Sequence, residues 1–185
     1  MCYKREKRIF RRSVVKDVDE MVIIADQGKA LLKSRGVQQW QRGTYPDRRL
    51  FLQDIEDAIG YVVEEENKVV GICAVTFTDE ESYRHLIQGE WMTKDTDCYA
   101  TIHRSAIARE QQGRHLSTFL FEAVEKMAKE KGAVSMRVDT HPDNLVMQGA
   151  LCRAGFEKCG EFYIAEGDEA GDLRYGYEKI IKQEV

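Results

Sequence analysis

The sequence has few of the features that mark membrane, linker-divided or repetitive proteins. Only two prolines occur in its 185 residues, and no Ser/Gly-rich linker or internal repeat divides them. No uninterrupted apolar run approaches the ~20 residues that a membrane-spanning helix needs. A chain of this length suits one domain better than two. We therefore expect a single domain over residues 1–185, with residues 1–8 as a flexible amino-terminal arm and no membrane contact.

Cysteine and histidine are too scattered for a metal site. No two of the five cysteines are spaced Cys-x-x-Cys, so neither a zinc knuckle nor a redox pair is predicted. The four histidines lie far apart, without the His-x-x-x-His helical pair that binds metals. The basic amino terminus also lacks the apolar stretch of a signal peptide. We expect no metal, reduced cysteines and a cytoplasmic location.

Charge of one sign is also scarce. The chain has 28 basic and 32 acidic residues and a formal net charge of -4, with 43% hydrophobic residues. Proteins that bind nucleic acid through its phosphates concentrate Lys and Arg, so this balance argues against a nucleic-acid partner. The slight acidic excess mildly favours a cationic substrate.

Apolar periodicity and stop signals predict the element order β-α-α-β-β-β-α-β-α-β-β, an α+β fold. The first helix should begin at Asp17, whose carboxylate would cap it together with Glu20, and should stop at Gly36. Residues 79–98 are polar and are expected to be irregular. The other predictions are strands at 9–15, 61–64, 69–75, 99–108, 134–139, 156–165 and 173–181, and helices at 47–59, 116–131 and 144–154.

The most informative segment joins the strand at 99–108 to the helix that follows it. Backbone N–H groups at a helix N-terminus form a ready anion site. Gly113 lets the backbone approach a ligand closely, and Arg114 and Ser117 are possible phosphate donors. The segment lacks the glycine spacing of a P-loop or of a dinucleotide fingerprint. Taken alone, such a turn is more often structural than functional.

In its wider context this segment resembles the GNAT superfamily of acyl-CoA-dependent N-acetyltransferases. The family's pyrophosphate loop reads Gln/Arg-x-x-Gly-x-Gly/Ala. Gln112 matches its first position, His115 replaces its first glycine, and Ser117 stands at the Gly/Ala position. Asn144 and the closing Gly155-Phe156 pair fit the family's later block.

The resemblance covers about residues 9–182 and is strongest over 99–160, where the chain is similar to bacterial members of undefined substrate. It implies a three-layer fold in which helices flank a central mixed sheet. In that sheet the parallel strands at 99–108 and 134–139 splay apart. It also implies transfer of an acetyl group from acetyl-CoA to a primary amine, on a small molecule or a protein, by direct attack in a ternary complex. Edge-strand pairing would allow a homodimer.

The resemblance assigns the cofactor to the end of one strand, the loop after it and the start of the next two helices. The implied cofactor-binding residues are Ala106, Ile107, Gln112, Gly113, Arg114, His115, Leu116, Ser117, Thr118 and Asn144.

Four residues are candidates for the base that takes the proton of the amine. Glu90 and His141 are the first choices. Glu90 comes from the side where acceptors usually enter in the family, and His141 follows the strand at 134–139, where its side chain could reach the splay. His103 and Asp139 are the alternatives. Histidine has an ordinary pKa near neutrality, which suits proton transfer.

Leu151 stands where the family often has a tyrosine that protonates the departing thiolate, so no acid is assigned. The neighbouring Cys152 lies about 100° around the helix and is interpreted as a packing residue. These departures motivate an alternative, a catalytically lapsed domain that binds or senses acyl-CoA. A purely structural domain is a third interpretation. The segment 39–46 either lines the acceptor pocket or packs its aromatic side chains locally.

Overall fold

The computed structural model describes residues 7–94 and 96–182, and most of the expected amino-terminal arm lies outside them. The elements in chain order are β1 (Arg8–Arg12), η1 (Val15–Asp17), α1 (Val18–Ser34), α2 (Arg48–Glu56), β2 (Gly60–Glu65), β3 (Lys68–Thr76), η2 (Glu81–Arg84), β4 (Gln88–Gly89), β5 (Tyr99–Ile107), η3 (Arg109–Gln111), α3 (Leu116–Glu130), β6 (Ser135–Thr140), α4 (Leu145–Arg153), β7 (Glu157–Tyr163) and β8 (Leu173–Ile180).

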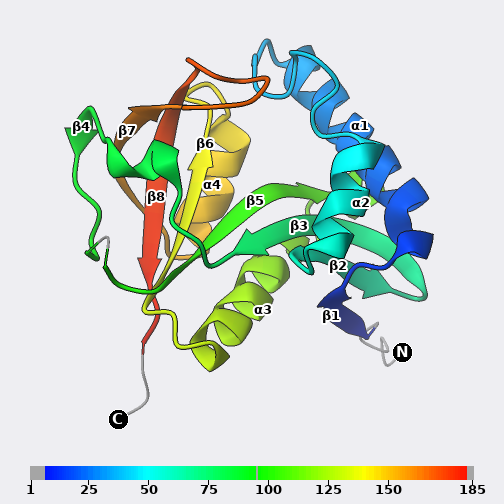
Figure 1. Ribbon diagram of the computed structural model, residues 1–185. Helices are drawn as coiled ribbons and strands as arrows, with labels where there is room; N and C mark the ends of the chain where they lie inside the picture. The colour runs from blue at the N-terminus through cyan, green and yellow to red at the C-terminus, as the bar shows by residue number, and fades with distance from the viewer. Residues whose placement is uncertain (1–6, 95, 183–185) are drawn as a thin grey trace.

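The strands form one mixed sheet in the order β1-β2-β3-β5-β6-β8-β7-β4 (Figure 1). Adjacent strand residues face opposite sides of a sheet, and the core follows that alternation. Val62 packs with α1 and α2 residues such as Met21, whereas Val63 packs with α3 residues such as Phe121. Helices therefore cover both faces, and the predicted three-layer α+β fold is confirmed.

The two central strands separate at one end of the sheet. The parallel pairing of β5 with β6 runs from Tyr99–Ser135 to Ile102–Val138, although β5 itself continues to Ile107. The expected splay of these strands is thus confirmed. It leaves the far end of β5 with a partner on its β3 side and an open edge on the other side.

The first turn of the chain differs from the prediction in two respects. The first strand begins at Arg8, inside the expected arm, and ends at Arg12. Asp17 does not cap α1, because its carboxylate instead accepts the N–H of Val14 at 2.9 Å and the Arg11 guanidinium at 2.7 Å. These bonds wind residues 15–17 into a 3-10 turn in place of the last strand residues.

Glu20 also has a different partner from the predicted one. Its carboxylate accepts the N–H of Val69 at the start of β3, so it ties α1 to the sheet rather than completing a capping box.

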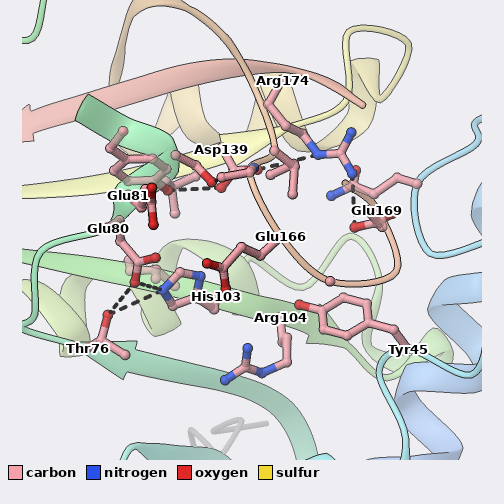
Figure 2. Close-up of a pocket in the computed structure, with 18 of the residues that line it drawn as sticks. Tyr45, Thr76, Glu80, Glu81, His103, Arg104, Asp139, Glu166, Glu169 and Arg174 are labelled. Carbon is pink, nitrogen blue, oxygen red and sulfur yellow. Dashed lines mark hydrogen bonds and ion pairs between the residues drawn. The ribbon is translucent and has the colours of Figure 1, made fainter. Parts of the chain in front are cut away.

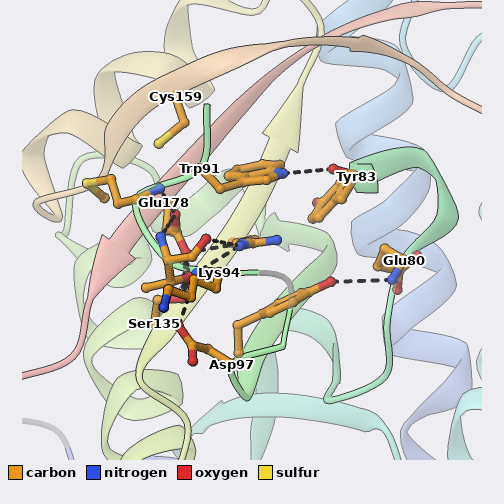
Figure 3. Close-up of polar contacts among 12 residues, drawn as sticks. Glu80, Tyr83, Trp91, Lys94, Asp97, Ser135, Cys159 and Glu178 are labelled. Atoms are coloured by element: carbon orange, nitrogen blue, oxygen red, sulfur yellow. Dashed lines mark hydrogen bonds and ion pairs between the residues drawn. The ribbon is translucent and has the colours of Figure 1, made fainter. Parts of the chain in front are cut away.

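The predicted irregular segment contains the short helix η2 and the two-residue strand β4, which pairs antiparallel with β7. Too few apolar residues alternate there for a strand pattern to be read from the sequence. A stack of side chains holds the segment against the sheet. The Trp91 indole N–H donates to the carbonyl of Tyr83 at 2.8 Å, and the Arg137 guanidinium lies between the rings of Trp91 and Tyr99 (Figure 3).

The Arg137 side chain of that stack also forms a buried ion pair. Arg137 and Glu178 are both fully buried, with Arg137 Nε 3.1 Å from Glu178 Oε1. The same carboxylate accepts the Ser135 hydroxyl at 2.6 Å and the N–H of Met92 at 2.5 Å (Figure 3). The segment that connects β4 to β5 is therefore fixed by charge-assisted hydrogen bonds rather than by regular structure.

Candidate functional site

Two cavities of about 500 and 510 Å³ meet where β5 and β6 part. We call them the α3 cavity, which opens on the first turn of α3, and the acidic cavity, which lies between β5, η2 and the β7–β8 loop. Both are lined by Gln39, Trp40, Ser105 and Met147. The two cavities therefore adjoin along these four residues.

The α3 cavity gathers nine of the ten residues that the resemblance assigned to the cofactor. They are Ala106, Ile107, Gln112, Gly113, His115, Leu116, Ser117, Thr118 and Asn144. These residues come from β5, the loop after η3, and the N-termini of α3 and α4. The tenth, Arg114, does not line the cavity, because its guanidinium turns to Glu65 at 3.2 Å and to the Gln111 side chain.

Two left-handed residues shape the entry to α3. Gly113 has φ 79° and His115, at the N-cap position, has φ 58°. His115 makes no side-chain capping bond, so its imidazole does not occupy the first amides of the helix. The N–H groups of the first helical turn have no intrahelical carbonyl and carry the positive end of the helix dipole. The N-terminal end of α3 therefore turns partly positive N–H groups toward the cavity.

Asn144 lines another wall of the α3 cavity as the N-cap of α4. Its Oδ1 accepts the N–H of Met147 at 3.2 Å, and its Nδ2 donates to Gln39 Oε1 at 3.1 Å. Gln39 Oε1 also accepts the Thr140 hydroxyl at 3.2 Å. The Gln39 side-chain amide therefore joins the loop after α1 to the end of β6 and to the start of α4.

The floor of the acidic cavity is a histidine–carboxylate pair. His103 Nε2 on β5 lies 2.9 Å from Glu80 Oε1, and the Thr76 hydroxyl lies 3.3 Å from both atoms (Figure 2). Burial alone would raise the pKa of Glu80, but hydrogen bonds from His103 and Thr76 outweigh it and lower that pKa. Glu80 is therefore a carboxylate at neutral pH, and it favours the proton on Nε2 of the histidine.

A chain of buried polar groups forms the opposite wall. Asp139 accepts the Tyr83 hydroxyl at 2.9 Å and lies 3.5 Å from Arg174 Nε. Arg174 Nη2 lies 2.9 Å from Glu169, whose other oxygen accepts the N–H of Trp40 at 2.5 Å (Figure 2). Burial raises the pKa of Asp139, against the opposing charge of Arg174.

The junction of the cavities coincides with an irregularity in β5. Arg104 has φ 53°, and the β3–β5 register shifts between the pairs Ile72–Ala106 and Ala74–His103. The Arg104 guanidinium is held by two hydrogen bonds to Asp54, at 2.7 and 3.1 Å. Arg104 and Ser105 thus fall in a bulge, and bulges commonly re-aim backbone groups next to active sites.

The two favoured base candidates do not line either cavity. Glu90 is exposed after β4, and its N–H donates to the carbonyl of Cys159 at 3.1 Å. His141 Nδ1 accepts the N–H of Asp143 at 3.1 Å. Neither is among the cavity-lining residues, whereas the two alternatives, His103 and Asp139, line the acidic cavity. Glu80 was missed, because no local signal distinguishes it within the polar segment 79–98.

Leu151 is fully buried in the core between α4 and the sheet.

Within residues 7–94 and 96–182, no group of three or more His, Cys, Asp or Glu side chains is placed to hold a metal ion. Over those same residues, no helix combines the length and apolar character needed to span a membrane.

Comparison with known proteins agrees with this geometry. The family model "Acetyltransferase (GNAT) family" matches residues 26–156. A crystal structure of a GNAT-family acetyltransferase from Streptococcus agalactiae is 25% identical, with a TM-score of 0.83 over 95% of this chain and 96% of that one. No curated protein sequence is significantly similar.

Two further crystal structures share the fold at lower identity. A GNAT-family acetyltransferase from Listeria monocytogenes is 20% identical, with a TM-score of 0.70 over 97% of this chain and 98% of that one. The ribosomal-protein-S18-alanine N-acetyltransferase of Escherichia coli is 10% identical, with a TM-score of 0.64 over 97% of both chains.

Proposed function

Because the chain belongs to the GNAT acetyltransferase family, we propose that it transfers an acetyl group from acetyl-CoA to a primary amine in a ternary complex. The observation that carries the proposal is that the two cavities adjoin and share Ser105 in their linings. Direct transfer needs donor and acceptor held side by side, and these cavities meet at the point where β5 leaves β6. The free thiols of the described cysteines favour a cytoplasmic setting.

The α3 cavity fits acetyl-CoA. The partly positive N–H groups at the start of α3 suit a diphosphate, and Gly113 brings no side chain between the backbone and a ligand. The open edge of β5 at Ala106 and Ile107 offers backbone groups to an amide-bearing arm such as pantetheine. Asn144 would lie beside that arm from the start of α4.

Bound acetyl-CoA would supply a thioester. Transfer joins its carbonyl carbon to the amine nitrogen and breaks its carbon–sulfur bond, and the proton that the nitrogen loses balances the one that the departing sulfur gains. The chain must take the proton that the amine loses, and we assign this role to His103 with Glu80. With Nε2–H donating to the carboxylate, the other ring nitrogen is the free acceptor, and Glu80 stabilises the imidazolium that forms. Ser105 N–H, in the bulge, is our candidate for polarising the thioester carbonyl.

The test is to incubate the protein with acetyl-CoA and a panel of primary amines. We expect release of free thiol in equal amount to acetylated amine, identified by its mass. The alternative, a lapsed acyl-CoA-binding domain, predicts a rise in Tm with acetyl-CoA but no acetylated product from any amine. That result would overturn the proposed transfer while keeping the proposed donor site.

A further inference from the structure

The acidic cavity has a strong excess of negative charge. Its lining includes two arginines and one histidine against seven carboxylates. The carboxylates are those of Asp79, Glu80, Glu81, Asp139, Glu166, Asp168 and Glu169. A cavity of about 510 Å³ has the size of a small-molecule site. Its charge therefore bears directly on which small amine can enter.

The positive groups of this lining are already paired within the protein. Arg174 lies between Asp139 and Glu169, and His103 is held by Glu80. The second arginine of the lining makes its bidentate contact with Asp54, a residue outside the lining. None of these cations is left to balance the remaining carboxylates.

Three carboxylates of the cavity have no ion-pair partner within the part of the chain that the structure describes. They are those of Glu81 on η2 and of Glu166 and Asp168 on the β7–β8 loop. Glu81 and Glu166 lie on different sides of His103 (Figure 2). The unpaired negative charge thus comes from two separate elements around the proposed reacting centre.

The β7–β8 loop is held in place over the cavity by contacts to the loop after α1. Glu169 accepts the N–H of Trp40, and Asp172 pairs with Arg42 at 2.6 Å. Asp168 lies so close to Gly43 that a Cβ added there would come within 2.2 Å of its carboxylate. These contacts therefore fix the place of the loop, although the side chains of Glu166 and Asp168 themselves are exposed.

We propose that the acceptor is a small diamine or polyamine, whose second ammonium group is bound by Glu166 and Asp168 while its reacting amine lies at His103. This inference rests on the proposed acetyl transfer. The cavity provides the space, and the unpaired carboxylates lack only a cation, which an acceptor with two positive charges brings. A like charge on the acceptor would instead be repelled.

Three amines of similar length test the effect of the charge at the end of the acceptor opposite its reacting amine. They are 1,4-diaminobutane, 1-aminobutane and 4-aminobutanoate, which carry a cation, no charge and an anion there. We expect kcat/KM to fall in that order, with the diamine about five- to tenfold above the monoamine, as for two contacts to exposed carboxylates. Added salt should shrink the advantage of the diamine.

Glu166→Gln locates the effect, with Glu157→Gln as the matched control, since Glu157 is exposed on β7 outside both cavities. We expect Glu166→Gln to raise KM for the diamine about three- to fivefold and to leave KM for the monoamine unchanged. The control should change neither. Equal rates for all three amines, a preference for 4-aminobutanoate, or acetylation of peptide amines alone would overturn the inference and leave acetyl transfer standing. Absence of acetylated product from every amine would overturn both the diamine inference and the proposed acetyl transfer.

Discussion

Replacing Glu80 with glutamine should lower kcat for amine acetylation about 30- to 150-fold, because each ~1.4 kcal/mol of lost transition-state stabilisation is a factor of ten in rate. Glu80 Oε1 and His103 Nε2 are 2.9 Å apart, and their side chains are 27% and 19% exposed. Two unit charges ~4 Å apart attract by ~4 kcal/mol at an effective dielectric constant of ~20. Partial exposure reduces this to about 2–3 kcal/mol, the stabilisation that the imidazolium loses in Glu80→Gln.

Removing the imidazole itself should cost more. We expect His103→Ala to lower kcat by about 10²- to 10⁴-fold, the usual contribution of a general base. The double variant should be no slower than His103→Ala, because Glu80 acts only through the histidine and effects within one unit are not additive. Since hydrogen bonds from His103 and Thr76 lower the pKa of Glu80 below its ordinary value, the carboxylate should stay charged where a free glutamate begins to take up a proton, and the acid limb of the rate should not arise from it.

The assay is the initial rate of thiol release at saturating acetyl-CoA, with Tm and the acetyl-CoA-induced shift as checks on folding and donor binding. Glu90→Gln is the decisive comparison, because Glu90 is the carboxylate that the sequence favoured. Full activity in Glu80→Gln together with a large loss in Glu90→Gln would refute the reasoning. Independent, additive losses in the double variant would refute the role of Glu80 as the partner of His103.

Three further predictions concern binding and stability. Ser117→Asp should leave Tm without ligand equal or higher, since a carboxylate stabilises a helix N-terminus, but should shrink the Tm shift on adding acetyl-CoA by repelling its diphosphate. Arg137→Met should lower the free energy of unfolding in urea by about 3–5 kcal/mol, because it leaves the Glu178 charge buried without its cation. Burial alone would raise the pKa of Asp17, but hydrogen bonds from Arg11 and Val14 outweigh burial and lower that pKa. The Asp17 carboxylate therefore stabilises the folded protein fully above its ordinary pKa, and this stabilisation is lost as the pH falls below that value. Asp17→Asn should accordingly flatten the acid limb of the stability–pH curve.

The donor half of the site was accessible from the sequence because it is local. Residues 106–118 run continuously from the end of β5 into α3, so the resemblance of this one segment to the family's pyrophosphate loop was enough to group them. The exception is Arg114, whose direction is set by Glu65 on β2. Which way that side chain turns depends on a contact across 49 positions, and no local pattern encodes it.

The acceptor half could not be predicted in the same way because its residues come from separate segments. Glu80 lies just before η2, whereas His103, Asp139 and Arg174 lie on β5, β6 and β8, and only the tertiary fold brings them together. Glu80 lies in the segment that read as irregular, which is positioned by tertiary contacts such as the Trp91 hydrogen bond rather than by hydrophobic periodicity. Charge pairing across such distances appears only once the fold is known.

Mass spectrometry of a primary amine after incubation with the protein and acetyl-CoA tests the account most directly. We predict that 1,4-diaminobutane gains one acetyl group per thiol released, and that His103→Ala slows this gain by at least about 100-fold while still binding acetyl-CoA. Tight acetyl-CoA binding by the unaltered protein with no acetylated amine would contradict the account.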